Sequence, residues 1–275
     1  MSEQSSGPLI GKRLVITRSA APGEAIGRAL SVRGAVPVML PLVAFADPED
    51  FAPLDAAISN IEQFDWIIFT SAQAVRAVMK RIGELKKQLI RTGSSVQVAA
   101  VGPVSAEAAR QAGFPLEYIA ETHTGMDLAE ELGKRLEGMR VFLPRSDRAN
   151  PDLPVALRRL GAEVQEVAAY RTLRPTEIDQ RKLRNIAEAE ADAVLFFSPS
   201  AVQHFIELFG GEQLRAMQDK LGIAAVGPVT AKALREAGVS RIVVAADTTA
   251  EAVIEALEKH FAGAGEAAPA GVKPG

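Results

Sequence analysis

The chain has 275 residues, of which 48% are hydrophobic, and it carries a net charge of −3 at pH 7 and no cysteine. This composition is typical of a folded globular protein, and it excludes a mostly disordered chain, disulfides and cysteine nucleophiles. The acidic balance and the 5% aromatic content argue against a surface for binding nucleic acid.

The predicted elements alternate between strand and helix along the whole chain. In the first half, apolar strands are expected at 13–18, 36–40, 65–70, 96–101 and 116–120. Between and after them, amphipathic helices are expected at 21–34, 51–61, 72–87, 103–113 and 125–136, and the second half repeats this order. Continuously apolar strands separated by helices indicate a parallel sheet covered on both faces. The sequence therefore predicts an α/β fold with two doubly wound, flavodoxin-like parallel-sheet domains.

Three pairs of similar blocks show that the two halves arose by internal duplication. GKRLVITRS is repeated as GMRVFLPRS, and DWIIFTSAQAV as DAVLFFSPSAV, each 127 residues further on. AAVGPVSAEAARQAGF is repeated as AAVGPVTAKALREAGV after 125 residues. One such match could arise by chance between α/β segments, but three in register indicate a repeat of one domain.

The two ends of the chain have no pattern of helix or strand. Residues 1–10 contain neither the basic nor the apolar region of a signal peptide, and residues 263–275 are rich in Ala, Gly and Pro. We expect both ends to be disordered. No apolar run is long enough to span a membrane, so the expected location is the cytoplasm, without a membrane partner.

Hydroxyl residues and Gly-Pro pairs stand where the predicted strands end and helices begin. In the first half these are Thr70, Ser71, Gly102, Pro103 and Val104; in the second they are Ser198, Pro199, Ser200, Gly227, Pro228, Val229 and Thr230. Each could be only a helix cap. Their repetition at equivalent places instead favours anion sites, because helix N-termini at the carboxyl ends of parallel strands bind carboxylates and phosphates.

Two arginine-serine pairs follow equivalent strands, Arg18-Ser19 in the first half and Arg145-Ser146 in the second. Arginine suits bidentate contact with a carboxylate, although a surface role is an equal alternative. Tyr170, one of two tyrosines, lies between a strand and the helix expected from near Glu177. Its spacing alone favours a half-buried strand residue over a proton donor.

Other motifs are missing from the sequence. It contains no phosphate-binding loop of the GxxxxGK[ST] type, no GxGxxG after the first strand and no GxSxG elbow. His123, His204 and His260 lack the spacing of metal ligands. These motif searches therefore identify no site for a metal or a cofactor.

Taken together, these residues resemble the uroporphyrinogen-III synthase family over about residues 11–262. The resemblance rests on Thr70-Ser71, on the segments 197–200 and 225–231, and on Tyr170-Arg171-Thr172. It implies two domains that exchange their opening segments and are joined by a two-strand hinge, with crossings near 37–42 and 167–172. One domain would comprise 11–38 with 173–262, and the other 39–172.

The resemblance also implies a function. Members of this family convert hydroxymethylbilane, a linear tetrapyrrole polycarboxylate, to uroporphyrinogen III in tetrapyrrole biosynthesis, closing the ring with inversion of the last pyrrole and loss of water. It implies a monomeric, cofactor-free lyase in which Tyr170 is the catalytic residue. The arginine-serine pairs and the two sets of strand-end residues given above would then bind the substrate. Val229 and Ala72 depart from the residues usual in the family.

The alternative is a non-enzymatic two-lobed sensor of a small metabolite, because two α/β lobes joined by two crossings also describe hinge-closing binding proteins.

Overall fold

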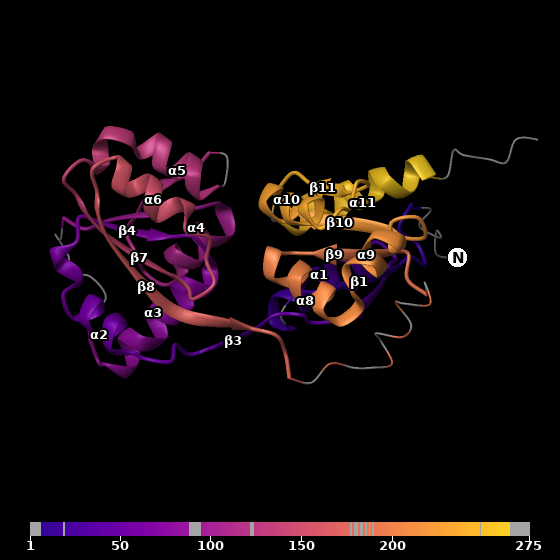
Figure 1. The fold of residues 1–275 in the computed structure, drawn as a ribbon, viewed down its shortest axis with the longest axis horizontal. Coiled ribbons are helices and arrows are strands. Elements are labelled where there is room, and N and C mark those ends of the chain that lie inside the picture. The colour runs from indigo at the N-terminus through magenta and orange to yellow at the C-terminus, as the bar shows by residue number, and fades with distance from the viewer. Residues whose placement is uncertain are drawn as a thin grey trace, which may run out of the picture. The chain divides into compact units, whose positions relative to one another are not determined.

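The fold is described from a computed structural model (Figure 1), which describes residues 7–264 apart from 19, 88–94, 122–123, 177, 179–180, 182–183, 185, 187, 189 and 248. The chain divides into two compact units. Unit 1 contains the residues up to Ala44 and those from Arg174 onward, and unit 2 is Phe45–Leu173. The chain therefore crosses twice between the units.

Unit 1 is built on a five-stranded sheet in the order β11-β10-β9-β1-β2. Its strands are β1 (Arg13–Ile16), β2 (Val36–Met39), β9 (Ala193–Phe196), β10 (Gly222–Val226) and β11 (Val243–Ala245), and they pair in parallel. Its helices are α1 (Ala20–Val32), α8 (Pro199–Phe209), α9 (Gly211–Met217), α10 (Pro228–Glu236) and α11 (Ala250–Ala264). Alternate residues of the strands enter two separate core clusters, so both faces of the sheet are covered.

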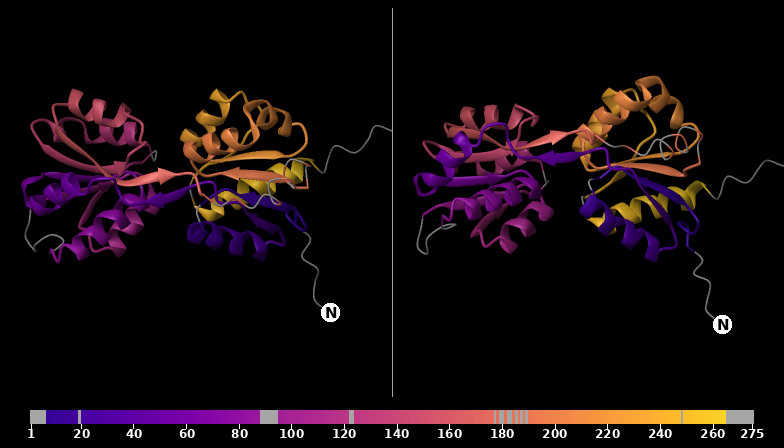
Figure 2. Two further views of the ribbon diagram at one scale, coloured as in Figure 1. Left: turned by 60° about the horizontal axis from the view of Figure 1, so that its bottom comes forward. Right: turned by 90° about the horizontal axis from the view of Figure 1, so that it is seen from below.

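Unit 2 has a six-stranded sheet in the order β3-β8-β7-β4-β5-β6. Its strands are β3 (Ala44–Ala46), β4 (Trp66–Phe69), β5 (Gln97–Ala100), β6 (Leu116–Ile119), β7 (Arg140–Ser146) and β8 (Glu163–Leu173). Its helices are α2 (Ala52–Ser59), α3 (Ala72–Glu84), α4 (Pro103–Gln111), α5 (Gly125–Leu132) and α6 (Asp152–Arg159), with 3₁₀ turns at Ile61–Gln63 and Gly133–Leu136. Figure 2 shows helices on both sides of each sheet.

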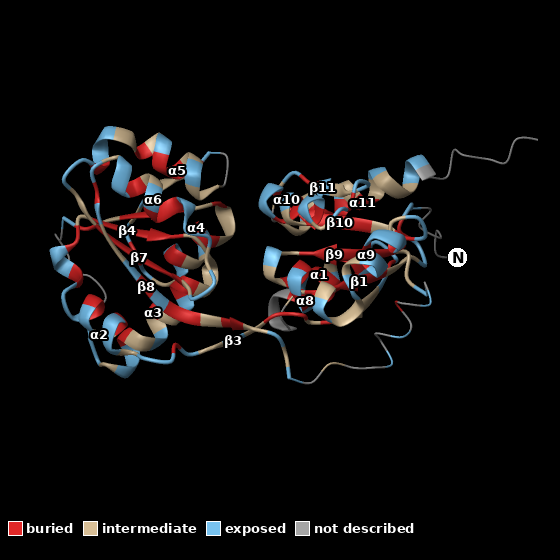
Figure 3. Cartoon of the chain, in the orientation of Figure 1, coloured by how far each residue is buried: buried red, intermediate tan, exposed pale blue. Residues whose placement is uncertain are grey.

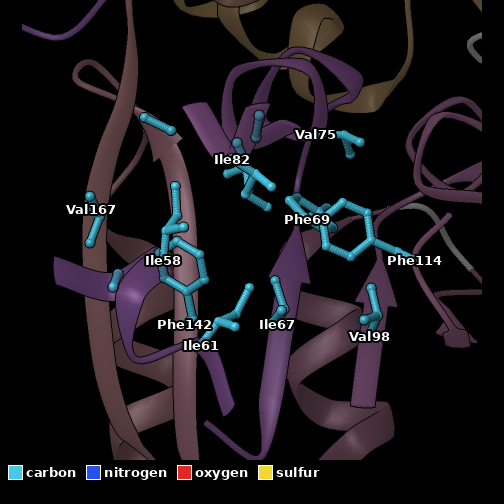
Figure 4. Close-up of a cluster of buried hydrophobic side chains, with 14 of the residues drawn as sticks. Ile58, Ile61, Ile67, Phe69, Val75, Ile82, Val98, Phe114, Phe142 and Val167 are labelled. Carbon is cyan, nitrogen blue, oxygen red and sulfur yellow. The ribbon is translucent and has the colours of Figure 1, made fainter. Parts of the chain in front are cut away.

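The central strands of unit 2 are apolar at every position because they are covered on both sides. In β4, Ile67 and Phe69 enter the cluster drawn in Figure 4, together with Phe142 of β7, while Trp66 and Ile68 enter the cluster on the opposite face. Figure 3 shows the same distribution, with buried residues in the strands and on the inner sides of the helices.

The opening segment of the chain pairs with the closing part. β1 lies between β2 and β9, and it pairs with β9 through Leu14 and Ala193. In Figure 1 the indigo β1 accordingly belongs to the sheet of the orange strands. The sheet of unit 1 has the flavodoxin order 2-1-3-4-5. The sheet of unit 2, apart from the added β3, has the same spatial arrangement when β7 and β8 are counted as the repeats of β1 and β2. The predicted α/β fold of two parallel-sheet domains is confirmed.

The boundary between the units differs from the expectation on the amino-terminal side. Residues 39–44 were expected in the second domain, but they lie in unit 1. Packing explains the difference, because Leu40 and Leu42 are buried in the same core cluster as Val15. The Leu42 carbonyl also accepts a hydrogen bond from the buried His204, with 2.6 Å between Leu42 O and Nδ1.

The ends and one helix differ from the expectation as well. Residues 7–10, expected to be disordered, form a turn whose Leu9 is fully buried, and α11 continues to Ala264, inside the expected tail. Residues 1–6, residues 265–275 and Glu177 lie outside the described part. The helix expected at 125–136 ends at Leu132 because Gly133 has φ of 46° and ψ of −125°, which a helix does not permit.

Candidate functional site

The strands of unit 2 end at helix starts with unpaired backbone N–H groups. Ser71 caps α3, and its Oγ accepts the N–H of Ala74 at 3.1 Å. Gly102 precedes α4 with φ of 78° and ψ of 162°, a conformation that is open to glycine and not to other residues. Thr124 caps α5. These helix starts offer backbone N–H groups and partial positive charge to an anion.

Unit 1 repeats this arrangement. Ser198 caps α8 by accepting the N–H of Ala201 at 3.3 Å, and Gly227 precedes α10 with φ of 85° and ψ of 161°. Thr249, at the start of α11, accepts the N–H of Ala252 at 3.3 Å. Four of the residues that the sequence singled out are therefore N-caps at equivalent places in both sheets: Ser71, Gly102, Ser198 and Gly227.

The side chains of these segments fall into three groups by exposure. Thr230 is buried, as is Ser105 at the equivalent place of the first half, so their hydroxyls face the interior. Half-buried are Thr70, Pro103, Val104 and Ser200, while Pro199, Pro228 and Val229 are exposed. At the Gly-Pro starts, the backbone is consequently the main polar group that a ligand could reach.

Tyr170, near the end of β8, contacts the Ser71 cap directly. Its phenolic oxygen lies 3.1 Å from Ser71 Oγ, and 8% of the residue is exposed. The ring of Phe45, in β3, meets the Tyr170 ring edge to face, with centroids 5.5 Å apart. Burial raises the pKa of the Tyr170 phenol, although the hydrogen bond with Ser71 and the charge of Arg145 act in the opposite direction. The phenol is consequently neutral at pH 7 and has a proton to donate.

An irregularity in β8 turns Tyr170 toward Ser71. Arg145 of β7 pairs with Ala168, but the next residue, Ser146, pairs with Tyr170, so β8 holds one extra residue at Ala169. In a regular strand the Tyr170 side chain would share the face of Ala168, which is exposed. The extra residue places Tyr170 in the core cluster on the α3 side of the sheet.

Hydrogen bonds from the end of β7 hold this part of β8. The backbone N–H of Asp147 donates to the Tyr170 carbonyl at 3.1 Å. The Asp147 carboxylate accepts from the backbone N–H of Thr172 at 2.9 Å and from the Ser146 hydroxyl at 3.0 Å. Ser146 Oγ also lies 2.7 Å from Thr172 Oγ1. The segment that carries Tyr170 is therefore fixed on both sides of the tyrosine.

The two arginines at equivalent places have different surroundings. Arg145 is 5% exposed, and its guanidinium donates to Glu166 at 3.0 Å and to the Asn150 carbonyl at 2.5 Å. Its Nε has no partner among the described residues, and burial lowers its pKa. Arg18 is half-buried, with its guanidinium over the ring of Phe197 at 5.3 Å. Ser19 lies outside the described residues.

Sequence reasoning missed two residues near Tyr170, Phe45 and Asp147, and it gave Thr172 no role beyond its part in the resemblance. No local signal marks Phe45, whereas Asp147 follows the Arg145-Ser146 pair and could have been found as a loop residue at a strand end. Thr124 and Thr249 were recognisable as helix starts but were not included among the candidates.

Other kinds of site were sought in the described part of the chain. It contains no group of three or more His, Asp or Glu residues that could hold a metal ion, and no helix that could cross a membrane. A cavity of about 310 Å³ in unit 1 is lined by residues such as Arg13, Val15 and Val38. None of the candidate site residues lines this cavity.

The fold and these helix starts define a class, that of two-domain α/β proteins with capped helix N-termini at the carboxyl ends of both parallel sheets. The family model described as "Uroporphyrinogen-III synthase HemD" matches residues 24–255. The chain belongs to the uroporphyrinogen-III synthase family, which is a family of enzymes.

Relatives and solved structures agree with this assignment. The chain is 30% identical over 240 residues to the uroporphyrinogen-III synthase of Synechococcus elongatus, covering 86% of this chain and 89% of the relative. A mutant uroporphyrinogen III synthase from the extremely thermophilic bacterium Thermus thermophilus has the same fold, with a TM-score of 0.63 at 24% identity over 90% of this chain and 100% of that one. The uroporphyrinogen-III synthetase of Helicobacter pylori also shares the fold, with a TM-score of 0.55 at 16% identity over 89% and 97% of the two chains.

Proposed function

We propose that this protein is a uroporphyrinogen-III synthase, a lyase that converts hydroxymethylbilane to uroporphyrinogen III and water. The family match and the 30% identity to the Synechococcus enzyme support the reaction. The single observation that supports the chemistry is the contact between Tyr170 and Ser71, because it places a neutral, nearly buried phenol beside a helix start.

Tyr170 would act as the general acid. Its O–H gives a proton to the hydroxyl of the substrate's hydroxymethyl group, the carbon–oxygen bond breaks, and water leaves. The substituted α-carbon of the last pyrrole attacks the resulting cation, which gives a spiro intermediate. The bond between this α-carbon and its original bridging carbon then breaks, the bridging carbon bonds to the other α-carbon of the same pyrrole, and loss of the proton from that carbon restores the charge balance. Because the substrate supplies its own reactivity, the protein mainly has to orient it.

The helix starts would bind the acetate and propionate groups of the substrate. In unit 2 these are the backbone N–H groups at Ser71 and Gly102, and in unit 1 those at Ser198 and Gly227. A carboxylate at a helix N-terminus gains about 0.3–1 kcal/mol from the helix dipole in addition to its hydrogen bonds. Such contacts require no positive net charge, consistent with a chain whose net charge is −3.

The family resemblance also supports a monomer that acts in the cytoplasm on this small-molecule substrate, without a metal or another cofactor. The alternative sensor function has no comparable support, because no observation at the site favours a stable ligand over a reactive one.

Analysis of the product isomer tests the function. Purified protein mixed with freshly made hydroxymethylbilane is expected to give uroporphyrinogen III, while a sample without protein gives the type I isomer that forms spontaneously. A protein sample that yields only type I would contradict the proposal. A sensor would in addition bind a stable metabolite without consuming it.

A further inference from the structure

The internal duplication provides a comparison of the site with its own copy. Ser71 and Ser198 are equivalent positions, 127 residues apart. Their backbones have nearly the same conformation, with φ and ψ of −157° and 149° at Ser71 and −162° and 156° at Ser198. Each serine caps the following helix through its Oγ. As helix caps, the two residues are the same.

The two copies differ at the position that Tyr170 occupies in unit 2. The position equivalent to Tyr170, by the same offset of 127 residues, is Val43. Val43 is buried, like Tyr170, but it has no polar side-chain atom. The pair of hydroxyls therefore exists in unit 2 and has no counterpart at the equivalent position of unit 1.

The hydrogen-bond inventory of Ser71 defines what it can do for the phenol. Its Oγ accepts one bond from the Ala74 N–H, and its own O–H remains to be donated. The Tyr170 oxygen, at 3.1 Å, lies within reach of that donor. When the serine donates, the phenol's O–H is directed elsewhere and is available to a substrate oxygen. The same serine hydrogen bond stabilises the phenolate that remains after the proton has left.

We propose that Ser71 is a positioning residue for proton donation by Tyr170, and that Ser198, its copy, has no such role. This inference rests on the proposed function, in which Tyr170 is the acid. It gives the two repeats different roles, because it assigns proton donation to unit 2 alone.

The charged groups around the phenol are compatible with this role. Burial raises the Tyr170 pKa most strongly; the hydrogen bond with Ser71 lowers it, as do the charges of Arg145 and Arg76, and the charge of Asp147 raises it. Removing the Ser71 hydroxyl deletes one of the groups that favour the phenolate. The pKa of Tyr170 is then expected to rise, which makes the phenol a weaker acid.

Two matched variants test the proposal, Ser71→Ala and Ser198→Ala, both in a Tyr118→Phe background. The background leaves Tyr170 as the sole tyrosine, because the chain has two. Ultraviolet absorbance of the phenolate then follows the titration of Tyr170 directly, independently of turnover. Both serine variants lose a helix cap, so their difference isolates the contact with the phenol.

Ser71→Ala is expected to move the Tyr170 titration to higher pH and to lower kcat about tenfold or more. Ser198→Ala is expected to leave the titration unchanged, whatever its effect on KM. Ser71→Thr keeps a hydroxyl and a cap, and it should restore both readouts. Should either alanine variant fail to fold, Ser71→Gly and Ser198→Gly remove the hydroxyl while retaining a good cap residue.

The inference would be overturned if Ser71→Ala and Ser198→Ala, or the two glycine variants, lost kcat equally and the Tyr170 titration stayed unchanged. This failure is distinguishable from a failure of the proposed function. If the wild type makes no uroporphyrinogen III, the function fails, while the titration still reports whether Ser71 acts on Tyr170.

Discussion

Asp147 illustrates how a single exposed residue can influence a buried one. Its carboxylate bonds the backbone N–H of Thr172, two residues after Tyr170, and its own N–H bonds the Tyr170 carbonyl. The carboxylate also bonds Ser146, which pairs with Tyr170 across the irregular position in β8. Asp147 is therefore expected to keep Tyr170 directed toward Ser71.

Asp147→Ala is predicted to lower kcat severalfold, because the Thr172 N–H of β8 and the Ser146 hydroxyl of β7 both lose the carboxylate that accepts their hydrogen bonds. Asp147→Asn is the matched control, since its amide oxygen can still accept the N–H of Thr172 and its kcat should remain near that of the wild type. Steady-state kinetics with separate kcat and KM values make the measurement. Equal kcat values for wild type and Asp147→Ala would show that β8 does not depend on this residue.

The sequence marked Ser71 and Tyr170 as candidate site residues, but it did not predict that they contact each other. Ser71 was recognisable from its place after an apolar strand, and Tyr170 gained its role from the family resemblance. Their contact could not be predicted, because the residues are 99 positions apart and meet only through the extra residue at Ala169. Strand register depends on the pairing of distant segments and not on local composition. The burial of Arg145 against Glu166 depends on the same register.

At the scale of elements, an aspartate joins the exchanged strand β1 to β9. Asp192 lies just before β9; its backbone N–H donates to the Arg13 carbonyl, and its carbonyl accepts the Gly222 N–H. Its carboxylate accepts hydrogen bonds from the Arg13 N–H at 2.8 Å and from Lys12 Nζ at 2.9 Å. The repeat places Asp65 in the same position before β4, where its carboxylate accepts the Arg140 N–H at 2.7 Å. The pairing of β1 with β9 and that of β7 with β4 therefore use the same aspartate contact.

Asp192→Ala is predicted to lower the free energy of unfolding by about 1–2 kcal/mol at pH 7. Burial of the Asp192 carboxyl opposes ionisation, but the bonds from Lys12 and Arg13 outweigh it and hold its pKa below the ordinary value. A lowered pKa contributes stability above the ordinary value of about 4, and that stability is lost as the pH falls. The difference between variant and wild type should therefore shrink toward roughly pH 3.

Urea unfolding of Asp192→Ala and the wild type at pH 7 and at roughly pH 3 measures this change in the free energy of unfolding. Glu190→Ala is a surface control, because Glu190 lies 3.8 Å from Arg13 with both side chains well exposed, and it should change stability by less than about 0.5 kcal/mol. A difference for Asp192→Ala that stays constant with pH would exclude the carboxylate as its source.

Most strands and helices could be predicted because apolar runs and caps are local signals. The apolar segment at Trp66–Phe69 and the Ser71 cap are examples. The helix expected over 125–136 ended early because a glycine in the sequence does not reveal that its backbone will leave the helical region. Leu9 is buried by packing on a core formed by residues far along the chain, which its own neighbourhood does not indicate.

At the scale of the whole molecule, the two copies of the duplicated α/β unit differ in the residue equivalent to Tyr170. Both copies retain the capped helix starts that suit carboxylates. The hydroxyl pair is found in unit 2, since Val43 replaces Tyr170 in the copy. We accordingly propose carboxylate binding in both units and proton donation in unit 2.

The measurement that tests this account most directly is the turnover of Tyr170→Phe, followed as uroporphyrinogen III formed from hydroxymethylbilane. Tyr118→Phe is the matched control, because it removes the phenol of the other tyrosine, which bonds Glu131. We predict a loss of roughly 10²–10⁴-fold in kcat for Tyr170→Phe with an unchanged circular dichroism spectrum, and near wild-type turnover for Tyr118→Phe. Equal turnover by the two variants would contradict the assignment of Tyr170 as the proton donor.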